Sequence, residues 1–403
     1  MKTRIVLLGA TGSVGSSAVD VIMRHPERFQ VEAVVGGSNV RQLAAVAQQV
    51  GARFAAVADS NKGDALKTAL ADAGLTIESG AGDAAVNAAV DVDCDLVVAA
   101  IAGTAGLRPT YRAIRPGRRI ALANKETLVC AGAAFMRDAH AAGVEILPLD
   151  SEHNALLQAM GGAHADDVEE MTLTASGGPF LNWTKDAIAA ATPEQALKHP
   201  NYAMGAKISI DSASMMNKGL EIIEAHYLFG IEHTRLQVLV HPQQLVHGLV
   251  SFRDGSVTAG MAAPDMRIPV AHCLSLGLGD SLDSGSGERL KTTLPRLDLA
   301  AVGRMEFFKP DMERFPALAL AFGALSAGGG LPTVLNAANE VAVEAFLARR
   351  IGFGQIAMVV EETCSAFAGK VNRSPESIDT ALEIDMLARQ WASNQLTHRF
   401  AAA

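Results

Sequence analysis

The sequence has few cysteines and no long apolar run. Its four cysteines, Cys94, Cys130, Cys273 and Cys364, are scattered over 403 residues without a CxxC pair. This spacing excludes a disulfide framework or a zinc ribbon and predicts reduced, buried thiols in a cytoplasmic protein. No stretch approaches the roughly 20 apolar residues of a membrane span. The apolar part of MKTRIVLLGATG is shorter than a signal peptide requires, so the sequence predicts no membrane association.

The chain also lacks an excess of positive charge. Its net charge is −9 and 49% of its residues are hydrophobic. Without a basic footprint, nucleic acid is excluded as a partner. A small anionic substrate would need a local cationic pocket. The length and the apolar content predict a large core divided into two or three domains.

Residues 1–150 alternate short apolar runs with Ala-rich helical patterns. The predicted strands lie in RIVLLGA, VEAVVGG, DLVVAAIAG, RRIALANK and VEILPLD. Strands that alternate with helices are typical of a parallel sheet. We therefore predict an α/β fold whose first domain, residues 1–150, is Rossmann-like.

The pattern changes after residue 150. Strand signals follow one another more closely in EMTLTASGG, AKISIDS, LQVLVHP, LVHGLVSF and SVTAGMAA, and some are spaced as hairpins. They predict a central α+β domain over residues 151–279. GLGDSLDSGSGERLKT is typical of a linker, which we place at 280–311. Residues 312–403 carry helical patterns and predict a C-terminal helical bundle.

Three glycines, Gly9, Gly12 and Gly15, lie between a predicted strand and a predicted helix in LLGATGSVGSSAVDVI. Glycines at such a turn let the backbone approach a pyrophosphate, and the helix start supplies free N–H groups. The spacing is GxxGxxG rather than GxGxxG, and a tight turn without a ligand is the alternative. The strand before and the helix after favour a dinucleotide.

The end of the second strand indicates which dinucleotide. NAD-binding sheets usually carry an Asp or Glu there, on the ribose hydroxyl. Here the strand ends in Gly36, Gly37, Ser38 and Asn39. No carboxylate repels a 2′-phosphate, and Ser38 and Asn39, with Arg41 as a further candidate, can contact one. This favours NADPH.

Two polar clusters follow later strands of the first domain. ALANKETL places Asn124, Lys125 and Glu126 at one strand end, and ILPLDSEHNAL places Asp150 and Glu152 at another. Ligands of parallel sheets bind beyond the carboxyl ends of the strands. Neighbouring carboxylates repel unless a cation lies between them, and Mg²⁺ or Mn²⁺ prefers such oxygens. The alternative is that Asp150 or Ser151 caps the helix EHNALLQAM.

The run HPNYAMGAKISIDSASMMNKGLEIIEAHYLFG carries an unusual density of polar residues. We predict a strand at 206–210 and a helix that begins near Ser212–Ser214. On that helix Asn217, Lys218 and Glu221 share one face. Hydroxyl, amide and ammonium groups near a helix start suit a phosphate monoester, and Ser176 in TLTASGGPF is a further hydroxyl. The alternative is a capped helix with a surface Lys–Glu pair.

Two further features have a functional and an ordinary interpretation. HPNYAMGAK is either a lid over a reactive intermediate or a surface loop. His241 and His247 are six residues apart, but Pro242 lies between them. Zinc is therefore disfavoured, and we expect both histidines to be structural or to lie at a dimer interface.

Taken together, the motifs carry a family resemblance that extends over nearly the whole chain. GATGSVG, ALANKETLV, LPLDSEHNA, TASGGPF, HPNYAMGAKISIDSASMMNKGLEIIEA, HPQQLVH, APDMRIP and NAANEVAVEAFL occur in the order typical of 1-deoxy-D-xylulose 5-phosphate reductoisomerases. The resemblance implies an NADPH- and metal-dependent enzyme of non-mevalonate isoprenoid biosynthesis. Such an enzyme rearranges and reduces a phosphorylated sugar to 2-C-methyl-D-erythritol 4-phosphate. It also implies a homodimer of three-domain subunits.

The resemblance assigns roles to individual residues. The implied metal ligands are Asp150, Glu152 and Glu221. Lys125, Glu152 and His199 are implied in catalysis, and Ser151, Ser176, His199, Ser212, Asn217, Lys218 and Glu221 in substrate binding. The implied cofactor contacts are Thr11, Gly12, Ser13, Val14, Gly37, Ser38, Asn39, Asn124, Glu126 and Gly205. Tyr202 and Met204 would belong to a flap over the substrate.

The chain departs from the family pattern at a few positions. Tyr202 stands where the flap commonly carries Trp, which leaves a smaller stacking face. Ser38 stands where many members have a basic residue, which puts the preference for NADPH in question. Two rival functions remain at this stage. A homoserine- or semialdehyde-type dehydrogenase would need neither the metal site nor the phosphate clamp. A non-catalytic NADP sensor would be expected to lose the ligands that are present here.

Overall fold

The computed structural model describes residues 1–198, 205–278 and 288–400. They form two compact units. The first unit comprises Met1–Thr127, Arg137–Asn154 and Asp265–Pro295, and the second comprises Leu128–Met136, Ala155–Pro264 and Arg296–Ala403. Part of the predicted linker, residues 280–287, lies outside the described residues.

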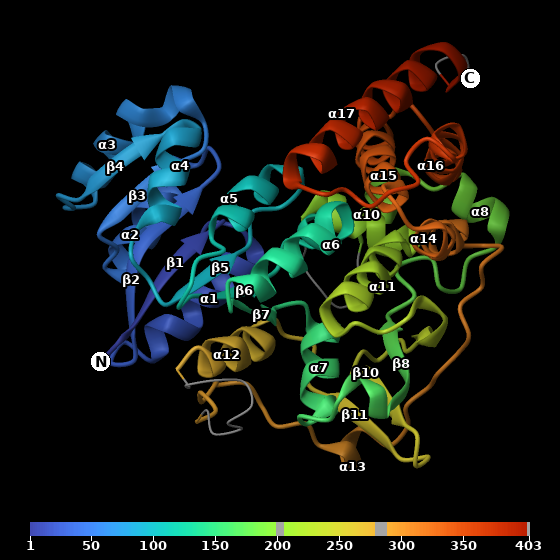
Figure 1. The fold of residues 1–403 in the computed structure, drawn as a ribbon, viewed down its shortest axis with the longest axis horizontal. Coiled ribbons are helices and arrows are strands. Elements are labelled where there is room, and N and C mark those ends of the chain that lie inside the picture. Colours follow the sequence, from blue (N-terminus) through green and yellow to red (C-terminus); the bar gives the residue numbers. More distant parts are fainter. Residues whose placement is uncertain (199–204, 279–287, 401–403) are drawn as a thin grey trace. The chain divides into compact units, whose positions relative to one another are not determined.

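The first unit is built on a seven-stranded parallel sheet of order β4-β3-β2-β1-β5-β6-β7 (Figure 1). The strands are β1 (Thr3–Leu8), β2 (Phe29–Gly36), β3 (Phe54–Val57), β4 (Glu78–Ala81), β5 (Leu96–Ala99), β6 (Arg119–Leu122) and β7 (Glu145–Pro148). The predicted Rossmann-like sheet is confirmed. Strands β3 and β4 were not predicted; β4, with the sequence ESGA, has no apolar run.

Helices of the first unit cover this sheet. They are α1 (Ser13–Arg24), α2 (Val40–Val50), α3 (Gly63–Asp72), α4 (Gly82–Asp91), α5 (Leu107–Arg112) and α12 (Arg267–Leu276). Their apolar faces pack with the strands into one core, in which Ile5, Leu7, Leu43 and Leu96 are completely buried. Helix α12 joins this core although it lies more than a hundred residues beyond β7 in the sequence. Two helices, α6 (Lys125–Ala141) and α7 (Ser151–Met160), contribute residues to both units.

The second unit contains a four-stranded mixed sheet of order β11-β10-β8-β9. Its strands are β8 (Val168–Ala175), β9 (Leu236–Val240), β10 (Val246–Phe252) and β11 (Val257–Met261). The pair β8–β9 is parallel and the other two pairs are antiparallel. The hairpin predicted within this region is confirmed by β10 and β11, which pair across a short turn.

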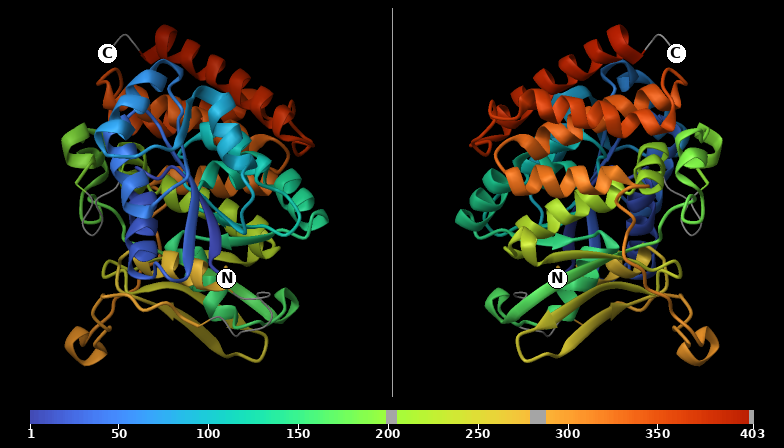
Figure 2. Two further views of the ribbon diagram at one scale, coloured as in Figure 1. Left: turned by 90° about the vertical axis from the view of Figure 1, so that its left-hand side faces the viewer. Right: turned by 90° about the vertical axis from the view of Figure 1, so that its right-hand side faces the viewer.

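The remaining helices belong to the second unit. They are α8 (Lys185–Ala189), α9 (Pro193–Ala196), α10 (Ala206–Ser214), α11 (Met216–Phe229), α13 (Leu299–Val302), α14 (Pro316–Ala327), α15 (Leu331–Leu347), α16 (Phe353–Phe367) and α17 (Ile378–Gln395). Helices α14–α17 form the predicted helical region, coloured orange to red in Figure 2. Helix α15 is its centre, because it packs against α14, α16 and α17.

The strand predicted at residues 206–210 is wrong, because these residues form the first half of α10. The alternation in AKISIDS spans too few residues to exclude a helical period. Helical spacing is used instead: the Ser209 hydroxyl donates to the Gly205 carbonyl at 3.1 Å, and Lys207 pairs with Asp211 four residues on at 3.0 Å. The predicted start of the next helix is also displaced, to Met216.

The four cysteines and the two histidines singled out in the sequence, His241 and His247, are mostly buried. All four cysteines are free thiols, and burial raises the pKa of the Cys94 thiol to about 11. His241 is completely buried, with ring nitrogens 2.9 Å from the Glu306 carbonyl and 3.1 Å from the Leu245 amide. His247 is also buried. Within the described residues, no helix is both long and apolar enough to cross a membrane.

Candidate active site

The glycine turn lies between β1 and α1, where the strand order reverses between β2 and β5. Gly9 has φ +81°, and a Cβ atom there would lie 2.3 Å from the Ala100 carbonyl oxygen. Gly12 caps α1 without a side chain, so the first N–H groups of the helix have no side-chain acceptor from the cap. Open parallel sheets bind ligands at this switch point. The turn thus has the backbone geometry of a pyrophosphate site.

The loop after β2 meets this turn through a residue that the sequence reading missed. Gly37, Ser38 and Asn39 are exposed, and the Asn39 side chain caps α2 by accepting from the Gln42 amide at 3.1 Å. The Gln42 side chain donates to the Thr11 carbonyl at 3.2 Å. Gln42 therefore ties the loop after β2 to the glycine turn. Only the contact with Thr11 reveals this role of Gln42, because a glutamine in a helix belongs to no sequence motif.

Asn124 and Glu126 follow β6, and both are buried. The Asn124 amide donates to the carbonyls of Ile101 and Gly103 at 2.7 and 2.9 Å and to the Glu126 carboxylate at 3.0 Å. Its oxygen accepts from the Thr127 amide at 2.9 Å. Asn124 thus fixes the loop after β5 to the start of α6.

Lys125 and Asp150 come together at the carboxyl ends of the neighbouring strands β6 and β7. The Lys125 ammonium forms an ion pair with the Asp150 carboxylate, and the two side chains are only 12% and 15% exposed. Because parallel strands end at the same edge, residues that follow them by two or three positions converge. This is the convergence that the motifs predicted.

The start of α7 holds the second carboxylate, Glu152. The Ser151 hydroxyl donates to the Glu152 carboxylate, and the Asp150 carboxylate accepts from the Glu152 amide at 3.2 Å. Asp150 is therefore a helix cap as well as a neighbour of Glu152. Glu152 is 7% exposed. Asp150 and Glu152 are thus two neighbouring carboxylates with little exposure to solvent. Their oxygens are ligands that suit a hard divalent cation.

Residues of helix α12 contact the segment that joins β7 to α7. The Asn154 amide donates to the Pro148 carbonyl at 3.0 Å and lies 3.0 Å from Nδ1 of His272 and 3.3 Å from the Cys273 sulfur. Burial, with the nearby Arg289 charge, lowers the pKa of His272 to about 4. At neutral pH this ring is uncharged and can accept at Nδ1. The contacts hold both the end of β7 and the first turn of α7.

In the second unit, the turn after β8 lies against α10. The Ser176 hydroxyl is buried and accepts from the Gly178 amide at 3.0 Å. A Cβ atom on Gly178 would lie 2.8 Å from the Ser212 carbonyl oxygen. The structure therefore brings Ser176 and Ser212 to neighbouring segments, as a shared phosphate site requires.

Helices α10 and α11 are separated by a break at Met215, which has φ +64°. Asn217 and Lys218 lie in the first turn of α11, and both side chains contact the Glu221 carboxylate. Lys218 and Glu221 are 4% and 1% exposed, so the alternative of a surface pair is wrong. A buried cation at a helix start is suited to an anionic ligand.

Of the other predicted site residues, His199, Tyr202 and Met204 lie outside the described residues. Gly205 is described: it is exposed and precedes α10. Ser13 is exposed in the glycine turn, and Val14 is half-buried there.

Comparison with known proteins agrees with this arrangement. Models for 1-deoxy-D-xylulose 5-phosphate reductoisomerase match residues 5–132, for its C-terminal domain residues 146–229, and for a further C-terminal domain residues 261–391. Reductoisomerases from Rhodopseudomonas palustris (strain TIE-1) and Bradyrhizobium sp. (strain ORS 278) are each 51% identical over 97% of this chain and 94% of theirs. The chain belongs to the 1-deoxy-D-xylulose 5-phosphate reductoisomerase family.

Solved reductoisomerases share the fold. The enzyme from Zymomonas mobilis in complex with NADPH has a TM-score of 0.89 and 42% identity over 99% of this chain and all of that chain. Another, in complex with NADPH, fosmidomycin and magnesium, has a TM-score of 0.91 and 38% identity over 98% of both chains. The predicted fold class is thereby confirmed.

Reductoisomerase motifs include NAANEVAVEAFL, to which the sequence reading gave no residue role. In the structure its Asn339 donates to the Asp211 carboxylate at 2.7 Å, and Lys207 pairs with the same carboxylate. Asn339 and Asp211 are 0% and 1% exposed. Asp211 immediately precedes Ser212, so Asn339 holds the helix that presents this hydroxyl.

Replacing Asn339 by alanine should therefore raise the KM for the phosphorylated substrate several-fold while kcat changes little. Loss of a partner for a buried carboxylate should also lower the free energy of unfolding by about 1–3 kcal/mol. Steady-state kinetics and urea unfolding measure both effects. The matched control is Asn336→Ala, one turn away and equally buried, which should lose stability without a change in KM. Equal KM changes in both variants would contradict the role of Asn339.

Proposed function

We propose that the chain catalyses the NADPH- and divalent-metal-dependent conversion of 1-deoxy-D-xylulose 5-phosphate to 2-C-methyl-D-erythritol 4-phosphate. This is a step of non-mevalonate isoprenoid biosynthesis. The observation that carries the proposal is 51% identity over 97% of the chain to reductoisomerases. The Lys125–Asp150 pair beside Glu152 supports it, because a dehydrogenase of the homoserine type has no need of such a group.

Asp150, Glu152 and Glu221 are proposed to hold Mg²⁺ or Mn²⁺. Oxygen ligands and the neighbouring carboxylates Asp150 and Glu152 fit a hard cation. When bound, the ion supplies Lewis acidity to the substrate's oxygen atoms. The Lys125 ammonium pairs with the Asp150 carboxylate; with a cation held by Asp150, Lys125 would be placed to donate to a substrate oxygen.

The glycine turn is proposed to bind NADPH, which supplies the hydride. The contacts come from Thr11, Gly12, Ser13 and Val14 at the start of α1. Gly37, Ser38 and Asn39 are proposed to contact the 2′-phosphate, which no carboxylate of this loop would repel. Gly205 is a further proposed contact. Asn124 and Glu126 are also proposed to lie at the cofactor, where the Asn124 amide in addition fixes the loop after β5.

The remaining side chains orient the substrate and handle its protons. Ser151 is proposed to bind the sugar backbone, and Glu152, which accepts from Ser151, to hold a proton during rearrangement. Ser176, Ser212, Asn217 and Lys218 are proposed to bind the phosphate. His199 is proposed to close over the phosphate, and the flap with Tyr202 and Met204 to exclude water.

Replacing Lys218 by alanine should raise the substrate KM by about ten-fold or more, because a charge-assisted phosphate contact contributes about 1.5–3 kcal/mol. Initial rates at saturating NADPH and Mg²⁺ measure this. Arg119→Ala is the control, because it removes a half-buried cation paired with Glu145 at 2.5 Å in the first unit. If KM is unchanged in Lys218→Ala, Lys218 does not touch the phosphate.

The protein is further proposed to be a cytoplasmic homodimer. The support is membership of the reductoisomerase family. Light scattering of the purified chain tests the dimer, for which we expect about twice the chain mass of 42.0 kDa. A monomer at working concentration would contradict it.

The decisive test of the function follows NADPH absorbance with purified protein and 1-deoxy-D-xylulose 5-phosphate, with and without Mg²⁺ or Mn²⁺. Metal-dependent oxidation of NADPH is expected, with 2-C-methyl-D-erythritol 4-phosphate as the product. A folded protein that binds NADPH but does not oxidise it under these conditions would contradict the proposal. Aldehydes without a phosphate group would then be tested as substrates for a dehydrogenase activity.

A further inference from the structure

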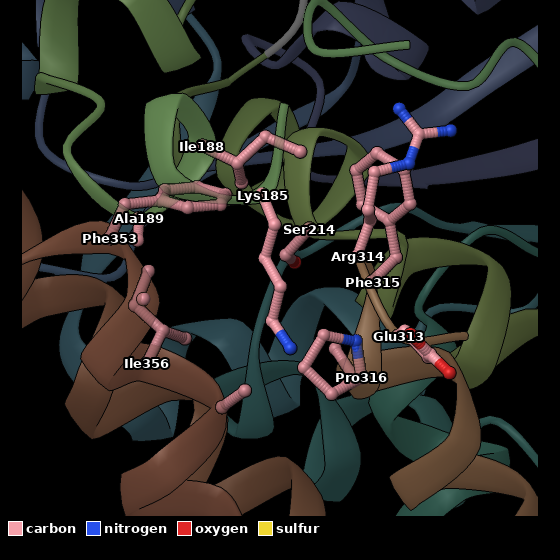
Figure 3. A pocket seen from close by; sticks show the side chains of 13 residues that line it. Lys185, Ile188, Ala189, Ser214, Glu313, Arg314, Phe315, Pro316, Phe353 and Ile356 are labelled. Atoms are coloured by element: carbon pink, nitrogen blue, oxygen red, sulfur yellow. The ribbon is translucent and has the colours of Figure 1, made fainter. Parts of the chain in front are cut away.

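A pocket of about 160 Å³ lies in the second unit, apart from the proposed substrate residues. Its walls come from α8, from the start of α14 and from the start of α16 (Figure 3). The wall residues Ile188, Phe315, Phe353 and Ile356 are buried and apolar. A cavity of about 150 Å³ with such a lining accommodates one benzene ring. The apolar part of an occupant is therefore limited to a single ring or a short branched chain.

One cation is directed into this pocket. Figure 3 shows the Lys185 side chain extending across it, with its amine between Ile356 and Pro316. Among the residues that the structure describes, no acidic partner of Lys185 lies within ion-pair distance. Lys185 is an exposed residue, so water can solvate its ammonium; at the rim of an apolar pocket it still favours an anion over a neutral or cationic guest through a charge-assisted contact.

The other charges at the rim do not replace Lys185. The Arg314 guanidinium points away from the pocket, where it pairs with Asp311 at 2.9 Å and donates to the Leu181 and Trp183 carbonyls. Glu313 lies on the far side of Pro316 from the Lys185 amine in Figure 3. Its carboxylate therefore weakens the attraction for an anion at longer range without pairing with Lys185.

The inner wall connects the pocket to the break between α10 and α11. Ser214 lines the pocket, and its hydroxyl donates to the Asp211 carbonyl at 3.2 Å and accepts from the Met216 amide at 3.3 Å. An occupant therefore lies against the residue that fixes both helices at Met215. This location distinguishes the pocket from an incidental surface hollow.

We propose that this pocket is a second binding site, for a small molecule with one apolar ring or short branched chain and a single carboxylate. The carboxylate pairs with Lys185, and the apolar part lies against Ile188, Phe353 and Ile356. The site is distinct from the proposed metal and phosphate sites, and none of its wall residues has a role in the proposed reaction.

Titration of the full chain with benzoate tests the proposal, with benzyl alcohol and benzylamine as the uncharged and cationic controls. Methyl NMR of isoleucine-labelled protein should show saturable shifts at Ile188 and Ile356. Benzoate should bind about five-fold more tightly than benzyl alcohol, and benzylamine least tightly, as a partly hydrated charge-assisted contact implies. Because binding is the readout, its failure leaves the proposed reaction untouched.

Three variants separate the contributions of the Lys185 charge, the Glu313 charge and the pocket volume to binding. Lys185→Met should remove the preference for benzoate over benzyl alcohol, whereas Glu313→Gln should strengthen benzoate binding about two-fold. Ala357→Leu, which fills the pocket, should abolish the shifts for all three compounds. Absence of saturable shifts in the wild type, or an unchanged benzoate preference in Lys185→Met, would overturn the proposal.

Discussion

Replacing Glu221 by glutamine is expected to lower metal-dependent turnover about a thousand-fold or more while NADPH binding is unchanged. A metal ligand contributes several kcal/mol of transition-state stabilisation, and about 4 kcal/mol corresponds to this factor. Glutamine keeps the size of Glu221 and retains one accepting oxygen for Lys218 or Asn217, which both donate to the Glu221 carboxylate. Alanine would instead remove this accepting group altogether beside the buried Lys218 ammonium and add a loss of stability.

The measurement combines NADPH oxidation over a range of Mg²⁺ concentrations with NADPH binding followed by fluorescence. Asp385→Asn is the matched control, because Asp385 is a carboxylate of similar burial that pairs with Arg389 at 2.6 Å in the helical region. Its loss should affect stability and not the Mg²⁺ dependence. Wild-type activation by Mg²⁺ in Glu221→Gln would remove Glu221 from the metal site.

The parts of the site that the sequence predicts are those governed by sheet topology. Lys125 and Asp150 each follow a strand of a parallel sheet, and strands of such a sheet end at one edge. Because β6 and β7 are neighbours in the sheet, Lys125 and Asp150 lie close together. The alternation of strands and helices in the sequence is enough to predict this. The same logic placed the glycine turn at the switch point, although it could not reveal Gln42, whose role depends on one tertiary contact with Thr11.

The parts that the sequence did not predict depend on long-range contacts or on unusual backbone. Apolar and polar residues alternate over 206–210 as they do in a strand. The segment is helical instead, and Asp211 contacts Lys207 one turn away and Asn339 of α15. The break at Met215 has a positive φ at a non-glycine residue, which no local signal announces. The bonds from the Asn124 amide to the loop after β5 could not be predicted either, because they join residues more than 20 positions apart in the sequence.

The second prediction concerns Gly9, and its expected effect is loss of NADPH binding. In Gly9→Ala the new Cβ atom would lie 2.3 Å from the Ala100 carbonyl oxygen, on backbone that cannot move without β5. The positive φ of +81° adds strain of about 1 kcal/mol or more. Because β1 and β5 meet at the switch point, the shift would displace the N–H groups at the start of α1. We expect NADPH affinity to fall at least ten-fold and Tm to fall by several degrees.

Gly74→Ala separates the effect of backbone strain from the effect of the close contact with Ala100. Gly74 belongs to the same unit and has a similar φ of +73°, but a Cβ atom there would meet nothing within 4 Å. It should therefore reproduce the loss of stability that comes from backbone strain and leave NADPH affinity unchanged. Calorimetry for Tm and fluorescence titration for NADPH measure both variants side by side. If Gly9→Ala binds NADPH as tightly as Gly74→Ala, the close approach of β1 and β5 is not what shapes the pyrophosphate site, and the glycine turn has only a structural role.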